Sequence, residues 1–123
     1  MVARLILAVD EEAGVRQALI DLLSLEGHEV DGASDAESAL LLLEQRRYDL
    51  VIADLRMPDL DGPQLLTTLV ERFGDTPPRL VFLTRGTFDP HYGSFLANLR
   101  APVLNKPLKP ARVLELVGQV LAS

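Results

Sequence analysis

Side chains suited to phosphoryl chemistry follow four apolar stretches of the chain, each at the point where the stretch ends. They are Asp10 and Glu11 after residues 5–9, Asp54 after residues 50–53, Thr84 after residues 80–83, and Lys106 after residues 103–104. A single acid or hydroxyl at such a point is most often a helix cap or a turn former. In an open parallel α/β sheet, however, ligands bind outside the carboxyl ends of the strands. The shared placement of all five residues therefore predicts one common site.

Asp54 is the candidate nucleophile of this site, because a carboxylate can attack phosphorus and become an aspartyl phosphate. Carboxylates gathered at one edge repel one another unless a cation neutralises them. Lys106 supplies one such charge, and Mg²⁺ suits a site of hard oxygen ligands. The Thr84 hydroxyl and the Lys106 ammonium could then stabilise the oxygens of a bound phosphoryl group.

Composition excludes several other kinds of site. The 123 residues, 48% hydrophobic and 24% charged, predict one globular domain covering residues 1–123. A net charge of −6 argues against direct nucleic-acid binding. There is no cysteine, and two isolated histidines make a zinc site improbable. No targeting or membrane-spanning segment is recognisable, so we expect a cytoplasmic protein without membrane insertion.

Hydrophobic periodicity predicts five strands alternating with five helices. The expected strands are residues 4–9, 29–32, 49–53, 79–83 and 102–104. Helices are expected from the acids 10–12 to Gly27, from a capping box at residues 34–37 to Arg46, from Pro63 to Gly74, over residues 90–99 as the poorest of the five, and from Pro110 onward. This alternation is typical of a doubly wound parallel α/β sheet with right-handed crossovers.

With these residues assembled, the chain resembles the receiver domain of two-component response regulators over essentially its whole length. The matching segments are Leu-Ala-Val-Asp-Glu-Glu (7–12), Val-Ile-Ala-Asp-Leu-Arg-Met-Pro-Asp-Leu-Asp-Gly (51–62), Phe-Leu-Thr (82–84) and Asn-Lys-Pro-Leu (105–108). The resemblance implies a flavodoxin-like (βα)5 fold with strand order 2-1-3-4-5. It also implies a phosphoacceptor for signal transduction that assists its own phosphorylation and dephosphorylation, rather than an enzyme.

The same resemblance assigns roles to single residues. Asp54 would take phosphate from a histidine kinase or a phosphotransfer protein and switch a partner-binding surface, with Thr84 and Lys106 contacting the phosphoryl group. Mg²⁺ would be held by Asp10, Glu11, Asp54 and the main-chain carbonyl of Arg56. The Lys106-Pro107 bond is often cis in similar domains.

Two positions depart from the family pattern. Val103 stands where an aromatic switch residue is common, and Arg85, a long cation beside the site, stands where a small residue is usual. Arg85 could narrow the site, pair with an acid or lie across the mouth. Residues 95–107 are similar to the terminal receivers of hybrid sensor kinases.

Two rival functions follow from other readings of these residues. One is a receiver-like binding module that is never phosphorylated, which Val103 and Arg85 would favour. The other, weaker, is a phosphatase with Asp54 as nucleophile, because such hydrolases usually place a second acid two residues on, where this chain has Arg56.

Overall fold

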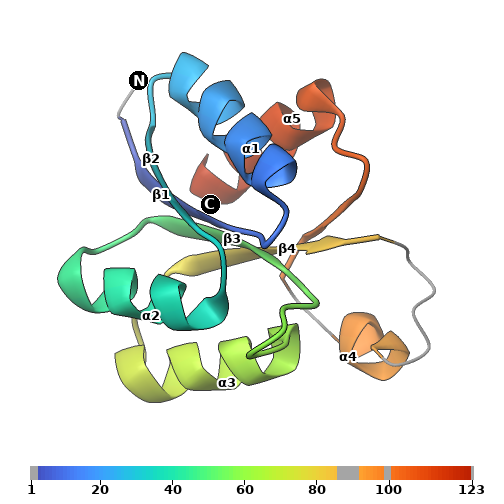
Figure 1. The fold of residues 1–123 in the computed structure, drawn as a ribbon. Helices are drawn as coiled ribbons and strands as arrows, with labels where there is room; N and C mark the ends of the chain where they lie inside the picture. The colour runs from blue at the N-terminus through green and yellow to red at the C-terminus, as the bar shows by residue number, and fades with distance from the viewer. Residues whose placement is uncertain (1–2, 86–91, 99–100, 123) are drawn as a thin grey trace.

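The computed structural model describes residues 3–85, 92–98 and 101–122, and within them strands and helices alternate along the chain (Figure 1). The strands are β1 (Leu5–Val9), β2 (Glu29–Ala33), β3 (Leu50–Asp54), β4 (Arg79–Thr84) and β5 (Val103–Asn105). The helices are α1 (Ala13–Leu25), α2 (Ala36–Gln45), α3 (Gly62–Phe73), α4 (Gly93–Asn98) and α5 (Pro110–Ala122).

The five described strands form one parallel sheet in the order β2-β1-β3-β4-β5. Helices α1 and α5 lie on one face of the sheet, and α2 and α3 lie on the other (Figure 1). The prediction of a doubly wound parallel fold with this strand order is therefore confirmed. The register places Ala53 beside Val9 and Asp54 beside Leu83, so the ends of the central strands lie level with one another.

A hydrophobic core lies on each face of the sheet, because successive strand residues point to opposite faces. Every residue of β3 is buried. Val51 and Ala53 belong to the core beneath α2 and α3, whereas Leu50 and Ile52 belong to the core beneath α1 and α5. A strand covered on both faces explains why the sequence of β3 is continuously apolar up to Asp54.

The two edge strands differ in what they carry. Strand β2 contains Glu29 and Asp31, and the Arg46 guanidinium reaches both, at 2.5 Å from Glu29 Oε2 and 2.9 Å from Asp31 Oδ2. The Tyr48 hydroxyl donates to the same Asp31 oxygen over 2.6 Å. The other edge strand, β5, has three residues.

Two predictions about where helices begin are wrong, one for α1 and one for α2. Helix α1 begins at Ala13, so residues 10–12 precede the helix rather than forming its first turn. Asp10 N donates to the Ala33 carbonyl over 3.1 Å at the end of β2. The chain then turns, because Asp10 Oδ1 accepts from Glu12 N over 2.9 Å.

The predicted capping box at residues 34–37 is also wrong. The cap of α2 is Asp35, whose Oδ1 accepts from Ser38 N over 2.7 Å. The first two amides of α2 donate to the carboxylate of Asp59: Ala36 N to Oδ1 over 3.2 Å and Glu37 N to Oδ2 over 2.9 Å. A carboxylate from a distant loop therefore does part of the work expected of a local cap.

Helix α3 begins at Gly62, one residue before the predicted start at Pro63. It also has a capping box between Asp61 and Gln64 that was not predicted from the sequence. Helix α4 begins at Gly93 within the described residues. Its predicted ends at Pro90 and Leu99 lie outside them.

Gly62, the first residue of α3, lets the loop after β3 fold back on the strand. Its amide donates to the Leu55 carbonyl over 2.8 Å. A Cβ at this position would overlap Leu55 Cδ1 and lie 3.0 Å from Phe82 Cε1, and both of these side chains are buried. Close packing at the base of the Asp54 loop therefore requires glycine here.

We expect Gly62→Ala to lower the free energy of unfolding by about 1–3 kcal/mol, because an overpacked core must shift its side chains. Denaturant unfolding measures this change. Gly14→Ala is the matched control, since a Cβ at Gly14 in α1 would meet no atom within 4 Å. The control should gain up to about 1 kcal/mol from helix propensity. A Gly62→Ala protein as stable as this control would contradict the packing argument.

Candidate functional site

Four strand ends bring the predicted residues to one edge of the sheet. Asp10 directly follows β1, Asp54 ends β3, Thr84 ends β4, and Lys106 directly follows β5. Backbone hydrogen bonds hold these ends together: Leu55 N donates to the Leu83 carbonyl over 2.8 Å, and Lys106 N donates to the Thr84 carbonyl over 2.7 Å. The parallel sheet thus gathers residues that are distant in the sequence.

The Lys106 ammonium lies at the centre of this cluster. Its Nζ is 2.8 Å from Asp10 Oδ2, 2.9 Å from Asp54 Oδ2 and 3.2 Å from Glu12 Oε1, and its side chain is 8% exposed. The Lys106-Pro107 peptide bond that follows is cis. Burial alone would lower the pKa of Lys106, but the carboxylates of Asp10, Asp54 and Glu12 outweigh burial and raise it to about 12. The lysine is therefore fully charged at neutral pH.

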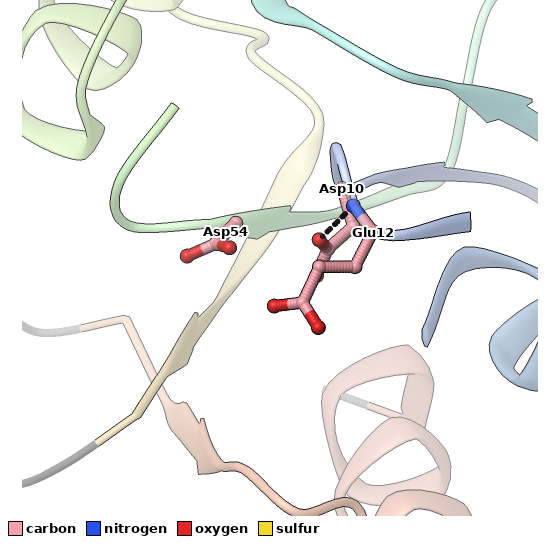
Figure 2. Close-up of side chains that lie close together, drawn as sticks. All are labelled: Asp10, Glu12 and Asp54. Atoms are coloured by element: carbon pink, nitrogen blue, oxygen red, sulfur yellow. Dashed lines mark hydrogen bonds between the residues drawn. The ribbon is translucent and has the colours of Figure 1, made fainter. Parts of the chain in front are cut away.

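Glu12, rather than Glu11, is the second acid that joins Asp10 at the site (Figure 2). The hydrogen bond from Glu12 N to Asp10 Oδ1 turns the chain so that the Glu12 side chain lies beside Asp10 and Asp54. Glu11 is exposed and lies outside this group, so its role as a metal ligand stays a prediction. The signal available in the sequence was an aspartate two residues before a glutamate, a spacing that favours a side-chain to backbone turn.

The cluster fits a small hard cation. One oxygen from each of Asp10, Glu12 and Asp54 lies within 4.8 Å of the others. Asp10 is fully buried, and its Oδ2 accepts no aligned hydrogen bond from the described residues, although Lys106 Nζ is 2.8 Å away. A buried carboxylate oxygen without such a bond is costly unless a positive charge meets it. Oxygen ligands of this kind suit Mg²⁺.

The two oxygens of Asp54 have different surroundings. Oδ1 accepts from Arg56 N over 3.1 Å, and Oδ2 faces Lys106 Nζ at 2.9 Å. The side chain is 9% exposed. These contacts fix the carboxylate, which is buried at the carboxyl end of β3. The Arg56 guanidinium lies over the Tyr92 ring, 5.4 Å from its centroid, and the role of the Arg56 carbonyl stays a prediction.

Thr84 is buried at the end of β4, next to the strand that carries Asp54. Its place agrees with the sequence prediction, and its contact with a phosphoryl oxygen stays a prediction. At the expected switch position, Val103 is half-buried and packs against the core beneath α2 and α3. The aromatic contact in this region comes instead from Phe95 of α4, whose ring meets Phe82 edge-on with centroids 5.7 Å apart.

Arg85 pairs with an acid, which was one of its three possible roles. Its guanidinium forms an ion pair with Glu12 Oε1, the same oxygen that faces Lys106. The Arg85 side chain is 73% exposed and that of Glu12 is 40% exposed, so this pair lies at the outer rim of the site. The hydrogen bond from Arg85 and then that from Lys106 lower the pKa of Glu12, which keeps the carboxylate ionised.

Among the described helices, none is both long enough and apolar enough to span a membrane.

The family model of the response regulator receiver domain matches residues 6–118. The response regulator protein FleR of Pseudomonas aeruginosa is 34% identical over 114 residues, which are 93% of this chain and 24% of FleR. The chain therefore spans about a quarter of the length of this relative.

Solved structures agree with the sequence comparison. The chemotaxis protein CheY4 of Vibrio cholerae has a TM-score of 0.85 at 26% identity, covering 97% of this chain and 99% of that one. The response regulator TrrA of Thermotoga maritima, solved in complex with Mg²⁺ and BeF, has a TM-score of 0.79 at 30% identity, covering 95% and 98%. With a family model that spans nearly the whole sequence and the matching fold, this chain belongs to the response regulator receiver domains of two-component signalling systems.

Proposed function

We propose that Asp54 accepts a phosphoryl group from a phosphohistidine of a histidine kinase or phosphotransfer protein, in the presence of Mg²⁺ bound beside Asp10, Glu12 and Asp54. The observation that carries this proposal is the buried Lys106 ammonium, which lies within 2.9 Å of both Asp10 and Asp54. Such an arrangement places a fixed positive charge beside the carboxylate at the end of β3. It is a preorganised setting for an incoming group with negatively charged oxygens.

In the proposed reaction, an Asp54 carboxylate oxygen attacks phosphorus, and the bond from phosphorus to the donor's nitrogen breaks as the acyl phosphate forms. The Lys106 ammonium stabilises charge on the phosphoryl oxygens. The Thr84 hydroxyl donates to another of these oxygens. Bound Mg²⁺ would supply further neutralisation of the transferred group. The product carries roughly 1.5 to 2 negative charges in place of the single charge of the Asp54 carboxylate, and this gain in charge provides the driving force for a change in the partner-binding surface.

Metal removal tests the proposal directly. We expect acetyl phosphate with MgCl₂ to add the mass of one phosphoryl group to the intact protein, and we expect excess EDTA to prevent this addition. Intact-mass spectrometry measures both results. Equal addition with and without EDTA would contradict a magnesium-dependent site.

The two neighbouring glutamates allow a matched test of which one serves the metal. We expect Glu12→Gln to weaken Mg²⁺ binding about tenfold, because Glu12 lies in the carboxylate cluster. Glu11→Gln removes the same charge from an exposed side chain and should change Mg²⁺ affinity less than twofold. Amide shifts in an NMR titration with MgCl₂ measure both affinities. A larger loss in Glu11→Gln would instead support the assignment drawn from the family resemblance.

A receiver-like module that works without phosphorylation is the second candidate. The ion pair of Arg85 with Glu12 at the rim favours it, because this pair occupies an acid that the metal site would use. A partner whose affinity is unchanged by acetyl phosphate and MgCl₂ would support this candidate.

A phosphatase has no comparable support, since the residue two places after Asp54 is Arg56, whose side chain stacks on Tyr92. The cytoplasmic location stays a prediction.

A further inference from the structure

Arg85 is ion-paired with Glu12, one of the three acids of the proposed metal site, at the solvent-exposed rim of that site. It directly follows β4, and its guanidinium forms an ion pair with Glu12 Oε1 across 73 residues of sequence. Lys106 Nζ lies 3.2 Å from the same oxygen. Glu12 is therefore shared by two cations, one buried within the cluster and one at its rim.

The two cations differ in how firmly the site holds them. Lys106 also contacts Asp10 and Asp54, and its side chain is 8% exposed. Arg85, with a side chain 73% exposed, forms its described ion pair with Glu12. An arginine on a long, solvated side chain can leave its partner at little cost, because exposed ion pairs are weak. Arg85 is thus the cation that can be exchanged without disturbing the buried part of the site.

A divalent ion entering the cluster must compete with Arg85 for Glu12. The three carboxylates of the cluster face two side-chain cations, Lys106 and Arg85, so most of their negative charge is already balanced. Each protein cation near the cluster lowers the attraction that an incoming cation feels. Removing Arg85 would free the Glu12 carboxylate and restore one negative charge to the metal site.

We propose that Arg85 is a positioning residue that restrains Glu12 at the rim and thereby sets the Mg²⁺ affinity of the site, leaving Glu12 when the metal binds. This inference rests on the proposed function, because it presumes that Mg²⁺ binds to the carboxylate cluster. It assigns a role to the position at which this chain carries a long cation where the family commonly has a small residue.

The test is a double-mutant cycle on Mg²⁺ affinity, measured by NMR titration of amide shifts with MgCl₂ at constant ionic strength. Arg85→Ala is expected to bind Mg²⁺ about twofold to fivefold more tightly than the wild type, the range set by an exposed ion pair. Arg85→Lys keeps the charge and should stay within about twofold of the wild type. In the Glu12→Gln background, Arg85→Ala should change the affinity by less than about twofold, because the restrained acid is gone.

Arg47→Ala serves as the control for net charge, since Arg47 is exposed and precedes β3, near the amino-terminal ends of the strands and away from the site at their carboxyl ends. Unchanged or weaker Mg²⁺ binding by Arg85→Ala would overturn the inference while leaving the proposed function intact. Equal tightening by Arg85→Ala in the wild-type and Glu12→Gln backgrounds would also overturn it, because Arg85 would then act on the cluster without Glu12. A wild-type protein whose amides do not respond to MgCl₂ would overturn both proposals.

Discussion

Asp54→Asn is expected to abolish covalent labelling by acetyl phosphate and MgCl₂. The substitution keeps the size of the side chain but replaces the nucleophilic carboxylate with an amide, which cannot form an acyl phosphate under these conditions. In the variant, the amide oxygen at position 54 can still accept the hydrogen bond that Arg56 N donates to Asp54 Oδ1 in the wild type. The variant should therefore fold, and intact-mass spectrometry should show the unmodified mass.

Asp75→Asn is the matched control for this experiment. Asp75 is exposed in the turn between α3 and β4, so it lies near the amino-terminal ends of the strands, whereas the site lies at their carboxyl ends. It loses the same charge and should be labelled like the wild type. Equal labelling of Asp54→Asn and wild type would show that another residue accepts the phosphoryl group.

Lys106→Met is expected to have the second largest effect, because it removes the cation that three carboxylates share. Labelling by acetyl phosphate should slow by about 10²–10³-fold, the typical loss of one preorganised charge-stabilising donor. The free energy of unfolding without Mg²⁺ should fall by roughly 3 kcal/mol, because buried acids are left without their partner. Time-resolved mass spectrometry and denaturant unfolding measure these two effects.

The stability difference between wild type and Lys106→Met has a defined pH dependence. The pKa of Lys106 is raised from 10.5 to about 12 in the folded protein. A raised lysine pKa means that folding favours the charged form, so its contribution is complete below pH 10.5 and is lost as pH rises through 12. The two proteins should therefore differ by a constant amount from neutral pH to about pH 10 and converge above it.

Lys109→Met provides the control for the lysine experiment. Lys109 is exposed and lies three residues further along the chain. Lys109→Met should leave the labelling rate unchanged. It should change the free energy of unfolding by no more than about 0.5 kcal/mol. A Lys106→Met protein that matches this control in both measurements would contradict the central role of the ammonium.

The positions of Asp10, Asp54 and Lys106 could be predicted because they depend on a global rule. Apolar runs that end on polar residues mark strand ends, and parallel connection brings those ends to one edge. The rule needs only the order and type of the elements. The contacts of Lys106 Nζ with Asp10 Oδ2 at 2.8 Å and with Asp54 Oδ2 at 2.9 Å agree with this shared placement at the strand ends.

The choice between Glu11 and Glu12 could not be predicted in the same way, because it depends on one local hydrogen bond. Asp10 Oδ1 accepts from Glu12 N, and this turn decides which of two adjacent side chains meets the cluster. The predicted capping box at the start of α2 was wrong for a different reason. Part of its capping comes from Asp59, 22 and 23 residues away in sequence from the amides that it binds, which a local pattern does not register.

The two outer strands bear on how this domain behaves at high concentration. Long, flat strand edges act as templates for intermolecular pairing and aggregation. Here one border of the sheet is three residues long, and the other carries Glu29 and Asp31, both engaged by Arg46. A second molecule pairing with β5 would find few backbone groups, and one pairing with β2 would have to accommodate the ion pairs of Arg46 with Glu29 and Asp31. We therefore expect neither border to serve as a template for fibre-like stacking when many copies are crowded together.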